Sequence, residues 1–254
     1  MDQSKESILQ KLVEMSISIG EPAKDLVILG DGNTSAFISN ESFYVKASGS
    51  QLNNISADGF TEVYFKPVLD ILKRESISDA ELKNEFTNAR VDAAGKHPSI
   101  ETVFHAIALS DCDARFVAHT HPISINSIMC SMDARKALSG HLFSESALYL
   151  GPEPIIIDYA DPGLPIARSL IYEIKKYQQK WGQQPRVFYL LNHGMVALGQ
   201  SAKEAENITS MAVKSARILL GTYQMGGPCF ISEEDVKRIV TRPDEEFRRK
   251  LANK

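Results

Sequence analysis

Two patterns of apolar residues alternate along this chain. In one, apolar residues recur three or four positions apart, which gives a helix a single apolar face. In the other, short unbroken apolar runs such as Val187–Leu191 are typical of buried strands. The first pattern predicts helices at Ser4–Ile19, Lys66–Lys73, Asp79–Asn88, Ile100–Leu109, Ile123–Met132, Leu164–Trp181, Ser201–Tyr223, Ser232–Val240 and Pro243–Ala252. The second predicts strands at Leu26–Leu29, Ala36–Ser39, Ser42–Lys46, Phe116–His121, Ala147–Leu150, Ile155–Tyr159, Arg186–Leu191 and Met195–Gly199.

This mixture of helices and strands predicts a protein of the α/β class. The sequence of 254 residues contains no internal repeat, low-complexity tract or linker rich in proline and serine. We therefore expect a single domain over residues 1–254, in which residues 226–254 form a C-terminal helical extension.

The composition is that of an ordinary soluble globular protein, with 43% hydrophobic and 24% charged residues. The formal net charge of −4 argues against a nucleic-acid binder, because neutralising phosphates requires a broad basic surface. The basic clusters Lys175-Lys176 and Arg248-Arg249-Lys250 lie in helical stretches of mixed charge, so we interpret them as solvated helix faces.

The cysteines indicate a reducing compartment. Cys112, Cys130 and Cys229 are odd in number and widely spaced, which disfavours a disulfide framework. No apolar signal segment follows the first residues, and no uncharged apolar run approaches the length of a membrane span. We expect a cytoplasmic protein that does not act on a membrane.

A pair of histidines at the end of one apolar run is the strongest chemical signal. The run Phe116–Ala118 leads into His119-Thr120-His121-Pro122. Side chains at i and i+2 of a strand point to the same face, so His119 and His121 present two imidazoles side by side. Such a pair can hold a divalent metal, although strand ends also carry ordinary surface histidines.

Glu101 and His193 are candidates to complete a set of three or four metal ligands. His193 follows a strongly β-prone run and so stands at a predicted strand end, as the histidine pair does. Glu101 falls in the first turn of a helix that Ser99 is expected to cap. There its carboxylate either projects toward a neighbouring loop or simply complements the helix dipole. His105, one turn later, is expected at the edge of the core rather than as a partner of Glu101.

Two loops of small residues are candidates for binding an anion. The glycines of Gly30–Ser35 allow a close approach to a ligand, and Asn33, Thr34 and Ser35 offer neutral donors. This segment is neither a P-loop nor a dinucleotide-binding fingerprint, because no Gly-Lys-Ser/Thr and no helix follow it. Ala47–Ser50 repeats the theme. A plain hairpin turn is the competing interpretation of the first segment.

Taken in order, these motifs resemble the class II aldolase/adducin family. They are Gly32-Asn33-Thr34-Ser35, Ser48-Gly49, Ser99-Ile100-Glu101, His119-Thr120-His121 and Asn192-His193-Gly194. The family includes fuculose-phosphate and rhamnulose-phosphate aldolases, ribulose-phosphate 4-epimerases, and related decarboxylases and dehydratases. The resemblance covers residues 5 to 225. Its specificity comes from the order of the whole set and not from any single motif.

The resemblance implies a fold, a metal and an assembly. The fold would be a three-layer α/β/α arrangement with a central mixed, mainly antiparallel sheet. A divalent metal, most often zinc, with Mn²⁺, Co²⁺ or Fe²⁺ as alternatives, would be held by His119, His121 and His193. Glu101 would ligate the resting metal or act as the acid/base. The chain would form a homotetramer with active sites at subunit interfaces. Residues that would bind a small-molecule substrate or its phosphate are Gly32, Asn33, Thr34, Ser48, Gly49 and Ser99.

Two positions depart from the pattern of the phosphate-binding members. Ile100 stands where these members usually have a second serine, and Phe37 stands where many have arginine. Both changes are expected to remove polar capacity from the anion pocket, which leaves open whether the substrate carries a phosphate.

The tyrosine of the phosphosugar aldolases is also missing. These relatives place a tyrosine of the neighbouring subunit near the position of Leu142 or Phe143, where it protonates the aldehyde-derived oxygen. Tyr159 or Tyr223 is the candidate replacement. Tyr223 is taken as the second catalytic candidate beside Glu101, because the C-terminal segment of relatives reaches the site.

These features predict a metal-dependent aldolase, a lyase that cleaves a small hydroxyketone, sugar phosphate or sugar acid. The open positions of a three-histidine metal let an α-hydroxyketone chelate, the metal stabilises the enediolate, and Glu101 carries the proton. A decarboxylase, a dehydratase or an epimerase would use the same site.

Two other classes are disfavoured. A cupin-type oxygenase has a glutamate shortly after its histidine pair, and no glutamate lies between His121 and His141. A non-catalytic scaffold such as the adducin head has lost the metal ligands, whereas this chain keeps all three histidines and Glu101.

Overall fold

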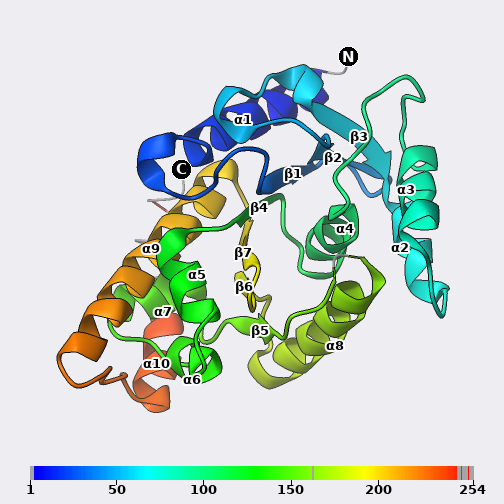
Figure 1. The fold of residues 1–254 in the computed structure, drawn as a ribbon. Coiled ribbons are helices and arrows are strands. Elements are labelled where there is room, and N and C mark those ends of the chain that lie inside the picture. Colours follow the sequence, from blue (N-terminus) through cyan, green and yellow to red (C-terminus); the bar gives the residue numbers. More distant parts are fainter. Residues whose placement is uncertain (1–2, 162, 245–246, 248–250, 252–254) are drawn as a thin grey trace.

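One seven-stranded sheet runs through the protein (Figure 1). The computed structural model describes residues 3–161, 163–244, 247 and 251. The strands are β1 Asn33–Phe37, β2 Ser42–Lys46, β3 Phe60–Tyr64, β4 Phe116–Thr120, β5 Ile155–Ile157, β6 Val187–Leu190 and β7 Gly194–Gly199. Their order across the sheet is β3-β2-β1-β4-β7-β6-β5, with only β5 and β6 parallel among the described strands. The mixed, mainly antiparallel sheet expected from the sequence is confirmed.

Helices cover both faces of this sheet. They are α1 Gln3–Ile19, α2 Phe65–Asp70, α3 Asp79–Asn88, α4 Thr102–Asp111, α5 Ile123–Met129, α6 Ala134–Leu138, α7 Ser144–Leu150, α8 Leu164–Trp181, α9 Ala202–Gln224 and α10 Glu233–Val240. The helices α2, α4 and α8 lie on one side, and α1, α5 and α9 lie on the other (Figure 1). The expected three-layer α/β/α arrangement is therefore also confirmed.

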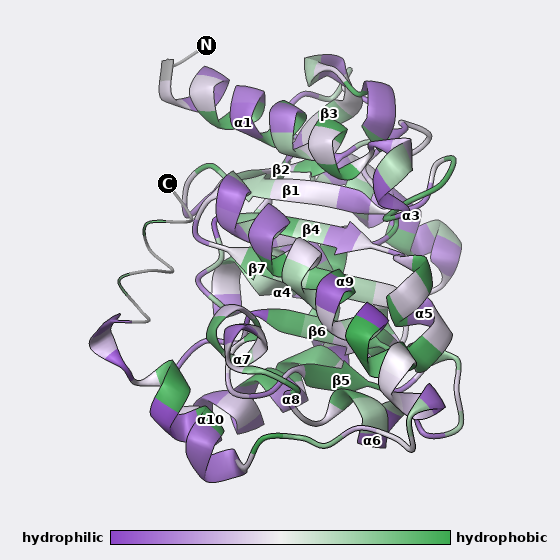
Figure 2. Ribbon diagram, turned by 90° about the vertical axis from the view of Figure 1, so that its left-hand side faces the viewer, coloured by the Kyte–Doolittle hydropathy of each residue, from purple (hydrophilic) through white to green (hydrophobic). Residues whose placement is uncertain are grey.

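Each face of the sheet has its own hydrophobic core, because successive strand residues point to opposite faces. Val117 of β4 packs in the core beneath α4 and α8, whereas its neighbours Phe116 and Ala118 pack beneath α1 and α9. Figure 2 shows apolar strands β5, β6 and β7 and hydrophilic outer surfaces on α1 and α10. Within the described residues, no helix combines the length and the apolar character needed to cross a membrane.

Two predicted strands are wrong. Ala147–Leu150 belongs to the helix α7, since a short apolar run fits a buried helical turn as well as a strand. Leu26–Leu29 is irregular, and Ile28 and Leu29 are 70% and 77% exposed. A turn replaces the strand there, because the Asp31 carboxylate accepts from the Ile28 N–H, and the Asp31 N–H donates to the Ile28 carbonyl.

Serine side chains cap the starts of α3, α9 and α10. Ser78 and Glu81 form a capping box at the start of α3. The hydroxyl groups of Ser201 and Ser232 accept backbone N–H groups at the starts of α9 and α10. The predicted helix at Pro243–Ala252 falls largely outside the described residues.

Two glycines in different surroundings give a test of the packing. A Cβ atom on Gly20, at the end of α1, would lie 2.3 Å from the Asn53 backbone nitrogen, whereas Gly221 in α9 has nothing within 4 Å of that position. We expect Gly20→Ala to lower the free energy of unfolding by about 1–3 kcal/mol through overpacking. Gly221→Ala should raise it by about 0.5–1 kcal/mol, because alanine favours the helix. Urea denaturation measures both, and a neutral Gly20→Ala would contradict the close approach.

Candidate metal centre

Three histidines from two separate regions of the chain meet at one end of the central strands. His119 is the fourth residue of β4, His121 follows that strand, and His193 lies in the turn between β6 and β7. One ring nitrogen from each lies within 4.8 Å of the others. The His119 side chain is completely buried, and those of His121 and His193 are 21% and 18% exposed. The structure thus brings together the three predicted ligands.

The local backbone fixes this convergence. The antiparallel pairing of β4 with β7 places Thr120 opposite Met195, so the end of β4 meets the start of β7. Asn192 adopts a left-handed backbone with φ of 57°, which turns the chain tightly enough to present His193. The Asn126 side chain of α5 donates to the His193 carbonyl at 3.0 Å and holds that turn.

The rings of His119 and His121 come so close to the backbone at the start of β7 that only glycine fits at position 194. A Cβ atom at this position would lie 2.6 Å from Cδ2 of His121 and 2.9 Å from Cε1 of His119. Any larger residue would therefore displace both imidazoles.

A hydrogen bond of His119 defines its tautomer. Nδ1 of His119 donates to the Met195 carbonyl at 2.9 Å, because a carbonyl oxygen only accepts. Nδ1 of His121 lies 3.5 Å from the Asp31 carboxylate. Burial lowers the pKa of both rings to about 4, so both are neutral at pH 7.

The remaining nitrogens suit a bound cation. Nε2 of His119 and Nε2 of His121 lie 2.9 Å apart. Because His119 carries its proton on Nδ1, its Nε2 presents a lone pair that can accept an N–H from His121 or bind a cation. Neutral imidazoles with the second nitrogen held by a carbonyl or a carboxylate are the usual ligands of zinc and related ions. The three-histidine group can hold a divalent metal.

Glu101 lies against this centre. It occupies the N-cap position of α4, one residue before the helix, and not its first turn as predicted. Its Oε1 is 3.0 Å from Nε2 of His193, and its Oε2 is 3.5 Å from Nε2 of His119. Burial alone would raise the pKa of the Glu101 carboxyl, but His119, His193 and Asn33 outweigh it and hold the pKa below its usual value. The carboxylate can serve as a further ligand or move a proton.

A buried chain of hydrogen bonds supports Glu101 from behind. The Asn33 side-chain amide donates to Oε2 of Glu101 at 2.5 Å, while the Asn33 oxygen accepts from Nε2 of His105. Nδ1 of His105 in turn accepts from the Ser35 hydroxyl at 2.7 Å. His105 is completely buried. The expectation of a core-edge residue is therefore wrong, because His105 acts on Glu101 through Asn33.

The predicted anion-binding loops lie beside Glu101. The Ser99 hydroxyl accepts from the Glu101 N–H at 3.2 Å and lies 3.4 Å from the Asn33 amide. Ser48 and Gly49 are exposed, and the Ser48 N–H donates to the His97 carbonyl. Ser48, Gly49 and Ser99 are thus within reach of a ligand, whereas the Asn33 amide already serves Glu101.

Two residues of the first loop, Thr34 and Gly32, are packed against the rest of the protein. Thr34 is completely buried, and its hydroxyl lies 2.6 Å from the Ser16 hydroxyl of α1, on the opposite face of the sheet from Asn33. Its side chain is not available to a substrate, which corrects the prediction. Gly32 has φ of 67°, and a Cβ there would lie 2.5 Å from the Val27 side chain and 2.9 Å from the His119 carbonyl.

Phe37 does not line the site. It stands at the opposite end of β1 from Asn33, about 13 Å away at the rise of a strand. Its ring packs against Phe65 and lies under the Arg115 guanidinium at 4.2 Å. The expected loss of polar capacity through Phe37 is therefore wrong, whereas Ile100 adjoins Ser99 and is 49% exposed.

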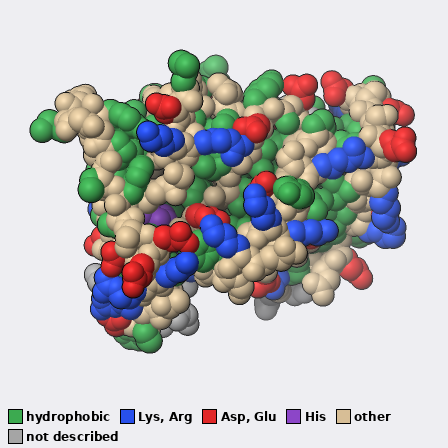
Figure 3. All heavy atoms as spheres, turned by 90° about the horizontal axis from the view of Figure 1, so that it is seen from below, with side chains coloured by type: hydrophobic (Ala, Val, Ile, Leu, Met, Phe, Trp, Pro, Cys, Tyr) green, Lys and Arg blue, Asp and Glu red, His purple; other side chains and the backbone are tan. Residues whose placement is uncertain are grey.

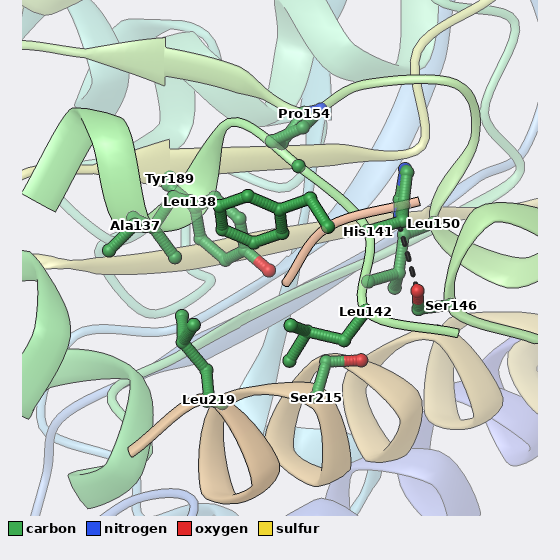
Figure 4. A pocket seen from close by; sticks show the side chains of 13 residues that line it. Ala137, Leu138, His141, Leu142, Ser146, Leu150, Pro154, Tyr189, Ser215 and Leu219 are labelled. Carbon is green, nitrogen blue, oxygen red and sulfur yellow. Dashed lines mark hydrogen bonds between the residues drawn. The ribbon is translucent and has the colours of Figure 1, made fainter. Parts of the chain in front are cut away.

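The candidate tyrosines do not join the centre in this chain. Tyr223 lies in the last turn of α9 and is 47% exposed, and Tyr159 is 64% exposed. In the described part of the chain, neither makes a hydrogen bond or ring contact with the histidines or Glu101. Leu142 lines a separate buried cavity of about 30 Å³ with Tyr189 and Ser215 (Figure 4).

Two charged residues at the centre were not predicted from the sequence. Lys46 is 4% exposed, its ammonium donates to the Gly30 carbonyl at 3.0 Å, and burial lowers its pKa. A lysine directly after the apolar residues Phe43–Val45 of the same strand was the available signal. Asp31, beside His121, gave no comparable signal.

Elsewhere on the surface, basic and acidic side chains intermingle on the face shown in Figure 3.

The buried histidines predict a loss of stability in acid. Burial lowers the pKa of His105 to about 3 and those of His119 and His121 to about 4, below the value of 6.5 in an unfolded chain. Protons therefore bind the histidines of the unfolded chain before those of the folded chain. The contribution of the neutral buried histidines to the free energy of unfolding is complete above pH 6.5 and is lost as the pH falls toward 4. At pH 5, each of these histidines should lower the free energy of unfolding by about 2 kcal/mol relative to neutral pH.

Urea denaturation of the metal-free protein at pH 7.5, 6 and 5 measures this loss. His105→Gln should reduce the pH dependence by about 2 kcal/mol. His97→Gln, at an exposed histidine, is the matched control for the substitution. Equal stability at pH 7.5 and pH 5 would contradict the assignment.

Comparisons with known proteins agree with this geometry. The chain is similar to the N-terminal class II aldolase domain of a conserved protein from Thermoplasma acidophilum, with 26% identity, a TM-score of 0.65, and coverage of 87% of this chain and 95% of that one. An L-fuculose 1-phosphate aldolase has the same fold, with 18% identity, a TM-score of 0.68, and coverage of 95% and 96%.

A curated relative is much longer than this chain. The uncharacterized oxidoreductase YuxG of Bacillus subtilis (strain 168) is 24% identical over 216 residues, which make up 82% of this chain and 29% of that protein. The model of the class II aldolase and adducin N-terminal domain matches residues 10–220. The chain therefore belongs to the class II aldolase and adducin N-terminal domain family.

Proposed function

We propose that this protein is a zinc-dependent aldolase that cleaves a carbon–carbon bond of a small hydroxyketone, sugar phosphate or sugar acid. The observation that carries the proposal is the convergence of three imidazoles with a buried carboxylate, whose oxygens lie 3.0 and 3.5 Å from two of the rings. His119, His121 and His193 would hold the metal. Three nitrogen ligands leave open positions for a substrate, which is typical of a catalytic rather than a structural zinc site.

The metal supplies Lewis-acid chemistry when bound, since it polarises the carbonyl of a hydroxyketone. In the cleavage, the β-hydroxyl gives up its proton and becomes an aldehyde. The bond between the α and β carbons breaks, and its electron pair stays with the α carbon, which receives a proton. Glu101 is positioned to move that proton.

The residues around Glu101 keep it ready for this role. The Asn33 amide fixes one carboxylate oxygen, and the neutral His105 behind Asn33 prevents the amide from turning. Phe104 is 1% exposed, and its ring lies edge-on to His119 at 5.2 Å, which excludes water from that side. Ser48, Gly49 and Ser99 would bind the substrate oxygens remote from the metal.

A decarboxylase, a dehydratase or an epimerase is the second candidate. The observation that favours it is the same convergence of three imidazoles and Glu101, which can serve these reactions equally. An aldolase would need, in addition, an acid for the aldehyde oxygen. Tyr223 of a neighbouring subunit would supply it in a homotetramer with active sites at subunit interfaces. The free cysteines Cys112, Cys130 and Cys229 favour a cytoplasmic location for that assembly.

The metal assignment predicts the behaviour of three variants. The purified protein should retain about one zinc ion per chain, and His119→Ala should abolish retention without unfolding the chain. Asp31→Ala should weaken zinc binding by about 10–100-fold, because it removes the carboxylate behind His121. His97→Ala is the control and should keep its zinc. Metal analysis and zinc titration measure these effects, and a folded wild-type protein that takes up no zinc would refute the proposal.

The acid/base assignment predicts a separation of turnover from metal binding. Glu101→Gln should lower kcat by about 10²–10⁴-fold and leave most of the zinc bound. Glu234→Gln, which changes an exposed carboxylate of α10, is the matched control.

The assay uses a panel of phosphorylated and unphosphorylated ketoses and keto acids, scored for cleavage and for decarboxylation. Cleavage would favour the aldolase and loss of carbon dioxide the second candidate. A fully active Glu101→Gln variant would remove Glu101 from the proton transfer.

A further inference from the structure

A large cavity lies next to the proposed active site and takes no part in the chemistry described so far. It has a volume of about 730 Å³ and lies between α3 and the segment 96–100. In Figure 1, α3 stands beside the chain that descends toward α4, and this chain carries the segment. A volume of this size is typical of ligand pockets and far exceeds what a single phosphate group needs.

The cavity is continuous with the predicted substrate-binding loops. Ser48 and Ile100 both belong to its lining. The Ser48 N–H donates to the His97 carbonyl at 2.8 Å, and the Ser99 N–H donates to the Lys46 carbonyl at 3.1 Å, so the two loops are held together at its edge. Ser99 also adjoins Asn33 and Glu101. Ser99 and Ile100 therefore lie between Glu101 and this space in the chain's local arrangement.

The lining combines an apolar wall with cations. Phe86, Pro98 and Ile100 supply apolar surface, and Ile100 remains 49% exposed. Lys83 and Lys96 add two ammonium groups, against the single carboxylate of Asp79 among the lining residues.

The two lysines differ in their partners. The Lys96 ammonium lies 2.8 Å from Asp58 in an exposed pair, with side chains 53% and 72% accessible. The Lys83 ammonium makes no hydrogen bond or ion pair within the part of the chain that the structure describes. Lys83 is thus a free cation at the edge of a largely apolar pocket.

We propose that this cavity binds the distal end of the substrate, and that this end is an anion carried on a carbon chain longer than that of a triose. The proposal rests on the proposed function, because it places the reacting hydroxyketone at the histidines. Ile100 packs against the carbon chain, and Lys83 binds the terminal carboxylate or phosphate. A carboxylate and a phosphate share this recognition, since both accept charge-assisted hydrogen bonds. A serine in place of Ile100 would hold an anion near Ser99 instead.

The test measures binding to the zinc-loaded protein by calorimetry. The probes are hydroxyacetone and hydroxyketones of five, six and seven carbons that end in a carboxylate or in a phosphate. Affinity should rise with chain length in at least one anionic series, and comparing the two series identifies the anion. Lys83→Ala should lower the affinity of the best anionic probe by about 2–5-fold, the range expected for a charge pair at an exposed side chain. The affinity for hydroxyacetone should not change.

Matched variants separate the cavity from general effects. Lys83→Arg should retain most of the affinity, and Lys175→Ala, on the exposed surface of α8, should retain all of it. Ile100→Ser should reduce the gain in affinity with chain length. Equal affinity of the wild type and Lys83→Ala for every anionic probe would overturn the proposal.

A second arm distinguishes this failure from failure of the proposed function. Pentyl phosphate and hexanoate lack the hydroxyketone and are titrated into the metal-free protein. Binding of these anions that depends on Lys83 would support the cavity as an anion site. If no hydroxyketone then binds the zinc-loaded protein, the proposed function alone is refuted. Binding of hydroxyacetone with no effect of Lys83 in either arm would refute the cavity alone. Absence of binding by every probe would refute both.

Discussion

The close approach of the end of β4 to the start of β7 is the constraint on which the metal centre depends. Gly194 leaves no room for a Cβ atom between the two strand ends, and this lets His119 and His121 meet His193 across the gap. The pairing of Thr120 with Met195 sets the distance, and the Met195 carbonyl fixes the tautomer of His119. Backbone geometry, and not side-chain flexibility, therefore determines where the ligand nitrogens point.

This arrangement buries polar groups that would be unfavourable in an ordinary core. Neutral histidines, a carboxylate and an amide lie together beside Phe104, and each has a hydrogen-bond partner. The chain of hydrogen bonds Ser35–His105–Asn33–Glu101 holds the carboxylate in place. Because each buried group is held by the next, the cost of desolvation is offset only when the whole set is in place. The site and the fold around it are therefore stabilised together.

The sequence revealed the chemistry of the site more fully than its geometry. The order of the motifs pointed to the histidines and Glu101 through the resemblance to the family, although no single motif was specific. Thr34 and Phe37 were misplaced because their orientation depends on where β1 begins and how it pairs, and neither is visible in a short apolar run. The same ambiguity between short helices and strands produced the error at α7. Asp31 acquires its role only when its loop closes on His121, which no local pattern encodes.

The histidine cluster and the cavity beside α3 are subject to different structural constraints. The metal end is fixed by strand pairing and by buried hydrogen bonds, so a change there disturbs both folding and chemistry. The cavity between α3 and segment 96–100 is bounded by exposed side chains such as Lys83 and Ile100, whose replacement leaves the sheet untouched. Replacements at Ile100 and Lys83 would therefore alter the lining of the cavity while the histidines and Glu101 stay in place. Ile100 joins the two halves, because it follows Ser99, precedes Glu101 and faces the cavity.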